Sequence, residues 1–464
     1  MKYGNTLKAL AHFDQYQQSF LDDVISLIKV PSVSFAGFDR AQVQAAAQLV
    51  EKQCRDAGLA NVRLLKEGKG YPAVYGEWTL AKGKPTVLLY AHYDVQPPGR
   101  EALWKSPPFE PEVRKERLYG RGSADDKAGV GAHLAAIASY LHSSGSLPVN
   151  VKVLFEGEEE VGSTSLPRLI ERNRNLLAAD VLVIADTVNL DTGIPSLTVA
   201  LRGLVTVKVE VRALAHSVHS GLWGGPLPDP ALALSKMLAG LVDKQGRPAV
   251  KGLMKRVRRT TKRELAEIEA LPFHEGLFRE QSGIIAPAAI TGGSAPAYAK
   301  MWYLPSIAVN AIEVSSRSQA ANIISDVAWA RLGIRTVADM DPDETLELLK
   351  AHLRKHAPWG VEVAIEPEPS ATWWRTDENT PAFRAAMRAL EKGYKRPAVK
   401  VGSGGSIPLV ALLTEALGGI PALLVGVEDP YSNPHSENES LHIEDWKKAC
   451  RSLIHLFDEL AGNP

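Results

Sequence analysis

Short apolar runs and helix-like segments alternate along the first 200 residues. Short, mostly apolar runs, which are typical of buried strands, occupy 85–92, 149–157 and 180–186. Between them, the segments 39–57 and 125–144 carry apolar and small residues at helical spacing. Buried strands separated by helices predict an α/β domain with a mostly parallel sheet flanked by helices.

The pattern changes near residue 200. In 204–213 apolar and polar residues alternate, as in an antiparallel strand with one exposed face. A helix, two strands, a helix and a strand are then predicted at 230–243, 306–314, 324–337, 342–356 and 360–366. The order β-α-β-β-α-β predicts a ferredoxin-like α+β fold for this part of the chain.

After this part the first pattern returns, with helices predicted at 380–393, 407–417 and 443–461 and a strand at 421–428. We therefore predict an α/β domain formed by residues 1–200 and 372–464. It is interrupted by an inserted ferredoxin-like domain, residues 201–371. A chain of 464 residues is also long enough for two domains.

Charge and cysteine content exclude several classes of protein. Lys plus Arg and Asp plus Glu number 53 each, and this zero net charge argues against general binding to nucleic acid or anionic membranes. The two cysteines, Cys54 and Cys450, form neither a disulfide framework nor a CxxC motif. The first 23 residues lack the apolar core of a signal peptide, and no stretch approaches the length of a membrane span. These features predict a cytoplasmic protein.

Histidine and carboxylate residues recur where the predicted strands end. His92 ends the strand 85–92, and Asp186 ends the strand 180–186. The other members of this set lie in loops that follow a strand or enter a helix: Asp94, Asp125, Glu159, Glu160 and His435. Because ligands of open parallel sheets bind outside the carboxyl ends of the strands, we expect these side chains to share one edge of the sheet.

Each of these residues alone has an ordinary structural explanation. Asp125 is placed to cap the helix that begins beside it. A run of three glutamates such as Glu158–Glu160, taken by itself, is more often an acidic surface turn. Together, however, the carboxylates need more counter-charge than Arg121 and Lys127 supply. Two divalent cations supply it, and mixed His and carboxylate ligands without cysteine favour a catalytic site for Zn, with Mn or Co as alternatives.

Seven motifs together resemble the di-zinc metallopeptidase family of carnosinase, cytosolic non-specific dipeptidase, peptidase V and the related desuccinylases and deacylases. They occur in the family's order: AHYDV (91–95), GRGSADDKAG (120–129), EGEEEVGS (156–163), IAD (184–186), HSG (219–221), GGSIP (404–408) and PHSEN (434–438). The resemblance implies a metal-dependent exopeptidase that hydrolyses dipeptides or short peptides with two metal ions per subunit. An N-acyl amino acid amidohydrolase of the same family is the alternative.

The family pattern implies a role for each ligand. His92 and Asp186 correspond to ligands of one metal, and Glu160 and His435 correspond to ligands of the other. Asp125 corresponds to the carboxylate that bridges both metals.

Three neighbouring positions receive roles from the same pattern. Asp94 corresponds to the residue that orients His92, and Glu159 corresponds to the catalytic base. Glu158 lies at a position that varies in the family, so we predict that it carries no chemistry. The resemblance also implies a cis peptide bond between Asp125 and Asp126.

The resemblance implies that residues 1–200 and 372–464 form the catalytic domain and that the inserted domain, 201–371, is a lid and dimerisation domain. The inserted domain holds most of the remaining implied site residues. His219 corresponds to a histidine that reaches the partner's active site in dimeric members, which implies a homodimer through this domain. Arg335 corresponds to an arginine that binds the substrate carboxylate, and Asn322 and Ser406 are further candidates. Taken alone, His219 is typical of a surface loop, Arg335 of a solvated strand, and 404–408 of a turn before a helix.

Two departures bear on the branch of the family. The segment 366–374, EPEPSATWW, lacks the histidine often found there in the carnosinase branch. Asp at 186 fits the dipeptidase and aminopeptidase branches better than the carboxypeptidase and deacylase branches. A nucleotide-dependent oxidoreductase is disfavoured because no G-x-G-x-x-G links a strand to a helix. A metal-binding protein without catalysis is disfavoured by the presence of Glu159.

Overall fold

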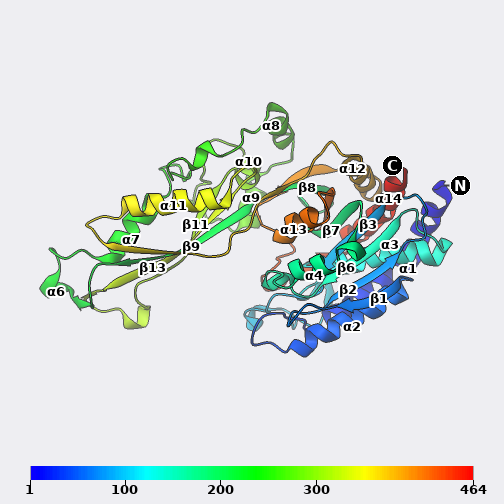
Figure 1. The fold of residues 1–464 in the computed structure, drawn as a ribbon, viewed down its shortest axis with the longest axis horizontal. Coiled ribbons are helices and arrows are strands. Elements are labelled where there is room, and N and C mark those ends of the chain that lie inside the picture. The colour runs from blue at the N-terminus through cyan, green and yellow to red at the C-terminus, as the bar shows by residue number, and fades with distance from the viewer. Residues whose placement is uncertain (1, 463–464) are drawn as a thin grey trace. The chain divides into compact units, whose positions relative to one another are not determined.

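Two compact units make up the chain in the computed structural model, which describes residues 2–462 (Figure 1). The first unit comprises Met1–Val199, Thr376–Val401 and Leu409–Pro464, and the second comprises Ala200–Arg375 and Gly402–Pro408. None of the helices among the described residues is long and apolar enough to span a membrane.

A nine-stranded sheet forms the centre of the first unit and confirms the predicted α/β class. Its order is β1-β2-β6-β3-β7-β17-β8-β15, with β16 beside β8. The strands are β1 (Ala60–Leu65), β2 (Ala73–Trp78), β3 (Thr86–His92), β6 (Asn150–Glu156), β7 (Val181–Val188), β8 (Ser196–Leu201), β15 (Trp374–Arg375), β16 (Val399–Ser403) and β17 (Ala422–Glu428). The four neighbours β6, β3, β7 and β17 are parallel, so their carboxyl ends meet at one edge.

The central strands are almost wholly apolar because they are buried. The sequence TVLLYAH of β3 is buried at every position after Thr86, and ALLVGVE of β17 is buried throughout. The outer strands β1, β2, β8, β15 and β16 were not predicted from the sequence. In β1 every position is exposed or half-buried, which leaves no continuous apolar run to mark it.

The helices of the first unit are α1 (Lys2–Ile28), α2 (Arg40–Asp56), α3 (Lys127–Ser144), α4 (Leu166–Arg172), α5 (Arg174–Leu177), α12 (Pro381–Tyr394), α13 (Pro408–Ala416) and α14 (Ile443–Gly462). The five longest of them contact one another. Helix α3 contacts α1 and α14 as well as the strands β3 and β7, which explains its small residues and its burial from Lys127 to Tyr140. Its first residue therefore lies at the carboxyl ends of the parallel strands.

Short elements complete the first unit. A three-stranded sheet is formed by β4 (Glu112–Arg114), β5 (Arg117–Tyr119) and β18 (Ser440–His442), and the single turns η1 (Glu101–Leu103) and η2 (Glu159–Val161) are 3₁₀ helices. Strand β18 ties the loop after β17 to the segment that leads into α3, because Leu441 pairs with Leu118.

A four-stranded antiparallel sheet with two helices confirms the ferredoxin-like prediction for the second unit. The sheet order is β11-β13-β9-β14, from β9 (Gly203–Arg212), β11 (Ser306–Glu313), β13 (Val327–Thr336) and β14 (Glu362–Pro367). Helices α7 (Pro230–Ala239) and α11 (Pro342–His356) supply the α elements of the β-α-β-β-α-β order. Alternate valines of β9, Val207, Val209 and Val211, face the core against these helices.

The rest of the second unit consists of short elements. These are β10 (Val218–His219), α6 (Ser220–Trp223), η3 (Leu253–Lys255), α8 (Lys262–Glu269), α9 (Glu275–Ser282), α10 (Ala297–Trp302), η4 (Arg317–Gln319) and β12 (Ile323–Ile324). The strands β10 and β12 pair as a separate antiparallel ribbon. The helices between 253 and 302 lie in a stretch for which the sequence predicted no regular structure.

Candidate metal centre

The predicted histidines and carboxylates meet at the carboxyl edge of the parallel strands. His92 is the last residue of β3, and Asp186 lies near the end of β7. Glu159 and Glu160 begin the 3₁₀ turn that follows β6, Asp125 lies two residues before the start of α3, and His435 follows β17. Five segments that are distant in sequence therefore deliver the set to one place, within the first unit.

Two groups of side chains are arranged as metal ligands, and Asp125 belongs to both. In the first group the Nε2 atom of His92 lies 3.0 Å from Asp125 Oδ1 and 3.8 Å from Asp186 Oδ1. In the second group His435 Nε2 lies 3.0 Å from Asp125 Oδ2 and 3.3 Å from Glu160 Oε2. Each group offers one ligand atom per residue within 4.8 Å of the others. The two oxygens of Asp125 thus face two different histidines, which is the geometry of a bridging carboxylate.

The chemistry of this set fits two divalent cations. His92 is buried, and its Nε2 atom has no hydrogen-bond partner although it faces carboxylate oxygens. Burial, and then the charge of Asp125, raises the pKa of Glu160 to about 10, and burial also raises the pKa of Asp186. Crowded carboxylates of this kind are costly without a cation, and imidazole with carboxylate is a donor set suited to Zn, Mn or Co.

The loop before α3 is fixed by the aspartate pair. The peptide bond between Asp125 and Asp126 is cis, as predicted. Asp126, not Asp125, caps the helix, because its carboxylate accepts the N–H of Gly129 at 3.2 Å and also that of His92 at 3.2 Å. Asp125 is thereby left to face the two histidines. Burial raises the pKa of Asp125, but the adjacent His435 and His92 outweigh it, so its net pKa is lowered.

Asp94 connects the first group to the glutamate turn. Its backbone oxygen lies 3.0 Å from His92 Nδ1 and its carboxylate lies 3.5 Å from the same nitrogen. The carboxylate also accepts the backbone N–H groups of Glu159 at 3.2 Å and Glu160 at 3.1 Å. One residue therefore contacts a histidine of the first group and the backbone that carries the glutamates.

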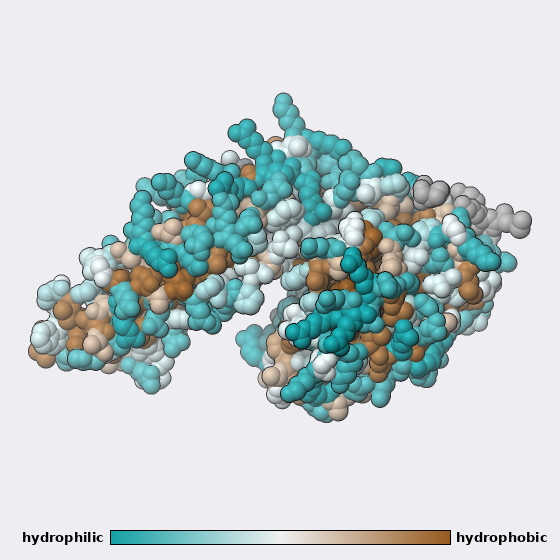
Figure 2. All heavy atoms as spheres, viewed as in Figure 1, coloured by the Kyte–Doolittle hydropathy of each residue, from teal (hydrophilic) through white to brown (hydrophobic). Residues whose placement is uncertain are grey.

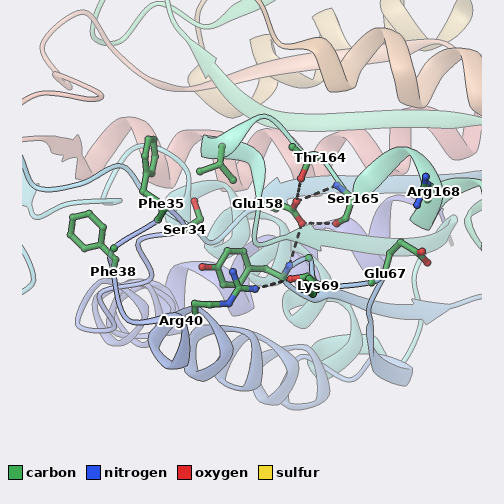
Figure 3. A pocket seen from close by; sticks show the side chains of 16 residues that line it. Ser34, Phe35, Phe38, Arg40, Glu67, Lys69, Glu158, Thr164, Ser165 and Arg168 are labelled. Carbon is green, nitrogen blue, oxygen red and sulfur yellow. Dashed lines mark hydrogen bonds between the residues drawn. The ribbon is translucent and has the colours of Figure 1, made fainter. Parts of the chain in front are cut away.

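Glu158 has a structural role that the sequence did not reveal. Its buried carboxylate accepts hydrogen bonds from the backbone N–H of Tyr71 at 3.2 Å, from Ser165 N–H at 3.1 Å and Oγ–H at 2.5 Å, and from the hydroxyl of Thr164 (Figure 3). It lines a cavity of about 850 Å³ that contains none of the proposed metal ligands. Glu158 thus anchors one end of the turn whose next two residues face the metal groups.

Two further residues shape the site without having been predicted. Gln96 donates its backbone N–H and its side-chain amide to Glu160, at 3.1 and 2.7 Å, which fixes the orientation of that carboxylate. Buried Glu439 accepts the N–H groups of Gly122, Ala124 and Asp125 at 2.9, 2.9 and 3.1 Å. The residue types of Gln96 and Glu439 did not indicate that they belong to the site, although Glu439 closely follows the motif PHSEN.

The remaining predicted residues belong to the second unit. Arg335 donates from Nη1 to Ser406 Oγ at 2.9 Å, so the structure brings these two together. His219 is exposed and its Nδ1 accepts the N–H of Gly221 at 3.0 Å, while exposed Asn322 accepts the N–H of Ser220 with its backbone oxygen at 2.9 Å. His219 and Asn322 are therefore close neighbours on the β10–β12 ribbon.

Comparison with known proteins gives a family match over most of the chain. Residues 88–459 match the sequence profile described as peptidase family M20/M25/M40. A cysteinylglycine-S-conjugate dipeptidase from Corynebacterium striatum is 35% identical over 360 residues, which cover 77% of this chain and 77% of that protein.

Solved structures of similar proteins share the whole fold. A metallo-carboxypeptidase of the M20 family from Sulfolobus solfataricus, Sso-CP2, superposes with a TM-score of 0.83 at 30% identity, covering 95% of this chain and 99% of that one. The di-peptidase Dug1p from Saccharomyces cerevisiae superposes with a TM-score of 0.85 at 25% identity, covering 100% of both chains.

Proposed function

Since the chain belongs to peptidase family M20/M25/M40 and is a metal-dependent peptidase, we propose that it hydrolyses dipeptides at the cluster around Asp125. The observation that carries this proposal is the shared carboxylate of Asp125, with one oxygen facing His92 and the other facing His435. The dipeptidase relatives support the size of the substrate. We propose zinc as the native metal, with manganese or cobalt as alternatives.

In this proposal His92, Asp186 and Asp125 hold one cation, and Asp125, Glu160 and His435 hold the other. Divalent cations at such a site lower the pKa of water and polarise the scissile carbonyl. Asp94 keeps the His92 ring in place through its contacts at Nδ1. The neutral imidazole then presents Nε2 to the carboxylate side of the site.

Glu159 is proposed as the proton carrier of the reaction. It is adjacent to Glu160 in the turn, and its own N–H is fixed by Asp94 at 3.2 Å. Its carboxylate takes a proton from the attacking water as the oxygen–carbon bond forms. It then gives that proton to the amine nitrogen as the carbon–nitrogen bond breaks, so that the products are a free acid and a free amine.

The carboxylate end of the substrate is assigned to the second unit. Arg335 is half-buried and donates one hydrogen bond to the hydroxyl of Ser406. The other N–H groups of its planar guanidinium group remain to bind a carboxylate. Asn322 is proposed as an additional donor to this carboxylate.

We also propose the domain division expected from the sequence. Residues 1–200 and 372–464 form the catalytic domain, and the inserted residues 201–371 serve as its lid.

A homodimer through the second unit is proposed because that unit exposes large apolar side chains. Leu222 and Trp223 of α6 are 78% and 54% exposed, and Ile312 of the edge strand β11 is 59% exposed. Figure 2 shows apolar surface over the region of α6, α7 and β13. A second copy of this chain would cover this surface and bring His219 to its partner's site, where it would donate a hydrogen bond to the oxyanion of the tetrahedral intermediate.

Subunit mixing tests the role of His219. Glu159→Gln and His219→Ala chains are each inactive in this proposal, but their hybrid dimer contains one complete site. Random exchange of subunits is expected to restore about a quarter of wild-type activity. Mixtures that stay inactive after confirmed exchange would contradict action across the dimer, and a fully active monomer in light scattering would contradict it as well.

A substrate panel tests the function itself. Metal-loaded protein is expected to hydrolyse dipeptides such as Ala-Leu and to act poorly on N-acetyl and N-succinyl amino acids. Hydrolysis of the acyl amino acids alone would show that the protein is an N-acyl amino acid amidohydrolase and not a dipeptidase.

A cytoplasmic location is also proposed, and the two buried, unpaired cysteines, Cys54 and Cys450, are in keeping with it.

A further inference from the structure

The cavity of about 850 Å³ beside Glu158 is formed by the first unit alone and contains none of the proposed metal ligands. Three stretches of chain line it, residues 34–40, 67–71 and 158–168. Its aromatic lining residues are Phe35, Phe38 and Tyr71, and its cationic ones are Arg40, Lys69 and Arg168. A cavity of this volume that combines apolar rings with a few charged groups is typical of small-ligand sites.

The cations of this cavity lack an acidic partner. No carboxylate among the described residues forms an ion pair with Arg40, Lys69 or Arg168. Arg40 lies over the ring of Tyr71, 4.1 Å from its centroid, and donates to the backbone oxygen of Lys69 at 2.7 Å. The positive charge of the lining is therefore available to an anionic ligand.

The two glutamates of the lining are engaged by other groups. Glu67 forms an ion pair at 2.7 Å with Arg172, which is not part of the lining. Glu158 accepts the backbone N–H groups of Tyr71 at 3.2 Å and Ser165 at 3.1 Å, besides two hydroxyl groups. Neither carboxylate is therefore paired with a cation of the lining.

A buried hydroxyl of the lining has no hydrogen-bond partner. Ser34 is 5% exposed, and its Oγ atom bonds to none of the described residues. Buried polar atoms of proteins are bonded in the great majority of cases, and those that are not call for an explanation. A polar ligand in the cavity supplies a partner for this hydroxyl.

The aromatic and cationic side chains are spread along the cavity. Figure 3 shows Phe35 and Phe38 on one side of Glu158 and Arg168 on the other. An elongated ligand with an apolar ring at one end and an anionic group at the other therefore fits the lining.

We propose that this cavity binds an aromatic phosphate monoester of about the size of a mononucleotide. Its ring packs on Phe35 and Phe38, and its phosphate accepts hydrogen bonds from Lys69 and Arg168. A phosphate monoester carries about two negative charges at neutral pH, which matches cations that no carboxylate neutralises. The inference goes beyond the proposed function and does not depend on it, because the site includes no metal ligand.

Binding at this site is expected to steady the turn that follows Glu158. Lys69 lies two residues before Tyr71 and Arg168 lies three residues after Ser165, and both Tyr71 and Ser165 donate to Glu158. A phosphate held by Lys69 and Arg168 connects these two segments and opposes their separation from Glu158. Exchange of the amide hydrogens in the turn should then become slower.

Titration calorimetry with adenosine monophosphate (AMP), adenosine and inorganic phosphate tests the ligand class on the metal-loaded full-length protein. AMP is expected to bind about tenfold more tightly than adenosine or inorganic phosphate, because each of these lacks one of the two recognised groups. Equal affinity for AMP and inorganic phosphate, or no saturable binding of AMP up to about 10 mM, overturns the proposal.

Matched substitutions connect the binding to this cavity. Lys69→Gln and Arg168→Gln each remove a cation of the lining and are expected to weaken AMP binding about tenfold. Lys66→Gln and Arg174→Gln, at exposed positions outside the lining, are the controls and keep the wild-type affinity. Ser34→Ala breaks no hydrogen bond of its hydroxyl, so it should weaken AMP binding without lowering the midpoint of thermal unfolding. Wild-type affinity in both Lys69→Gln and Arg168→Gln overturns the proposal.

Hydrogen exchange locates the site and separates it from the metal centre, which is a second place where a phosphate can bind. Saturating AMP is expected to slow amide exchange in the segments 34–40, 67–71 and 158–168. Exchange in 433–437, the loop that carries His435, should stay unchanged. Slower exchange in 433–437 without slower exchange in 34–40 and 67–71 shows binding at the metals and overturns the inference.

Discussion

The carboxylate of Asp94 accepts the backbone N–H of Glu160 at 3.1 Å, and that of Glu159 with its other oxygen. The same residue contacts His92 Nδ1. Asp94 therefore sets the position of groups on both sides of Asp125, although it is not itself placed among the metal ligands.

Replacement of Asp94 is expected to weaken metal binding and turnover together. In Asp94→Ala both amides lose their acceptor and His92 loses the nearby carboxylate, although Nδ1 keeps the backbone oxygen of residue 94. We expect 10–100-fold weaker metal affinity, with a loss of kcat/KM of at least similar size. Asp94→Asn keeps one acceptor oxygen, so its metal affinity and kcat/KM should lie between those of the wild type and those of Asp94→Ala. Competition with a chromogenic chelator measures the metal affinity. Wild-type affinity in Asp94→Ala would show that Asp94 does not position the metal ligands.

Glu159→Gln separates catalysis from metal binding. The amide keeps the size of the side chain but cannot accept and return a proton, so kcat should fall about 10²–10⁴-fold. Elemental analysis is expected to show two metals per chain, as in the wild type. Wild-type turnover, or loss of metal with loss of turnover, would contradict the assignment of Glu159 as base.

The two ligand groups predict different metal contents in two variants. His435→Ala removes a ligand of the second group only, so one metal per chain should remain after dialysis. Asp125→Ala removes the residue common to both groups and should reduce the content further. Equal metal contents in wild type and His435→Ala would show that His435 is not a ligand.

A buried histidine away from the metal groups predicts an acid sensitivity of the fold. His133 is buried on α3 with Nε2 3.1 Å from Tyr90 O, and burial lowers its pKa to about 4. The unfolded chain, with a histidine pKa near 6.5, therefore binds a proton before the folded chain does, so stability falls as the pH drops from about 6.5 towards 4. Between pH 7.5 and 4.5 this contributes a loss of about 2–3 kcal/mol.

Urea unfolding of wild type and His133→Leu in the presence of chelator checks this prediction. The free energy of unfolding of the variant should fall less between the two pH values, by about the amount assigned to His133. Parallel losses in both proteins would show that His133 does not titrate as described.

The sequence predicted the central strands and the ligands for the same reason. Strands β3, β6, β7 and β17 are largely buried, so they appear as apolar runs, and the ligands follow their ends directly. Strand β8 was missed, and only Arg202 separates it from β9, the strand that the sequence predicted at 204–213. Gly203 allows this corner, where a Cβ atom would lie 2.3 Å from Thr336 Oγ1.

Other parts of the site depend on contacts that no local pattern encodes. Glu439 binds three backbone N–H groups of the segment 122–125, more than 300 positions away. Glu158 was predicted only to carry no chemistry, and nothing in the sequence indicated that its carboxylate binds groups of Tyr71, Thr164 and Ser165.

Removal and return of metal tests the central claim most directly. Protein dialysed against a strong chelator should lose dipeptidase activity, and titration with Zn, Mn or Co should restore it with an endpoint of two ions per chain. Ion binding can be followed separately by calorimetry. Full hydrolysis of Ala-Leu by protein shown to be free of metal, or failure of the chelated protein to bind any of these ions, would contradict the account.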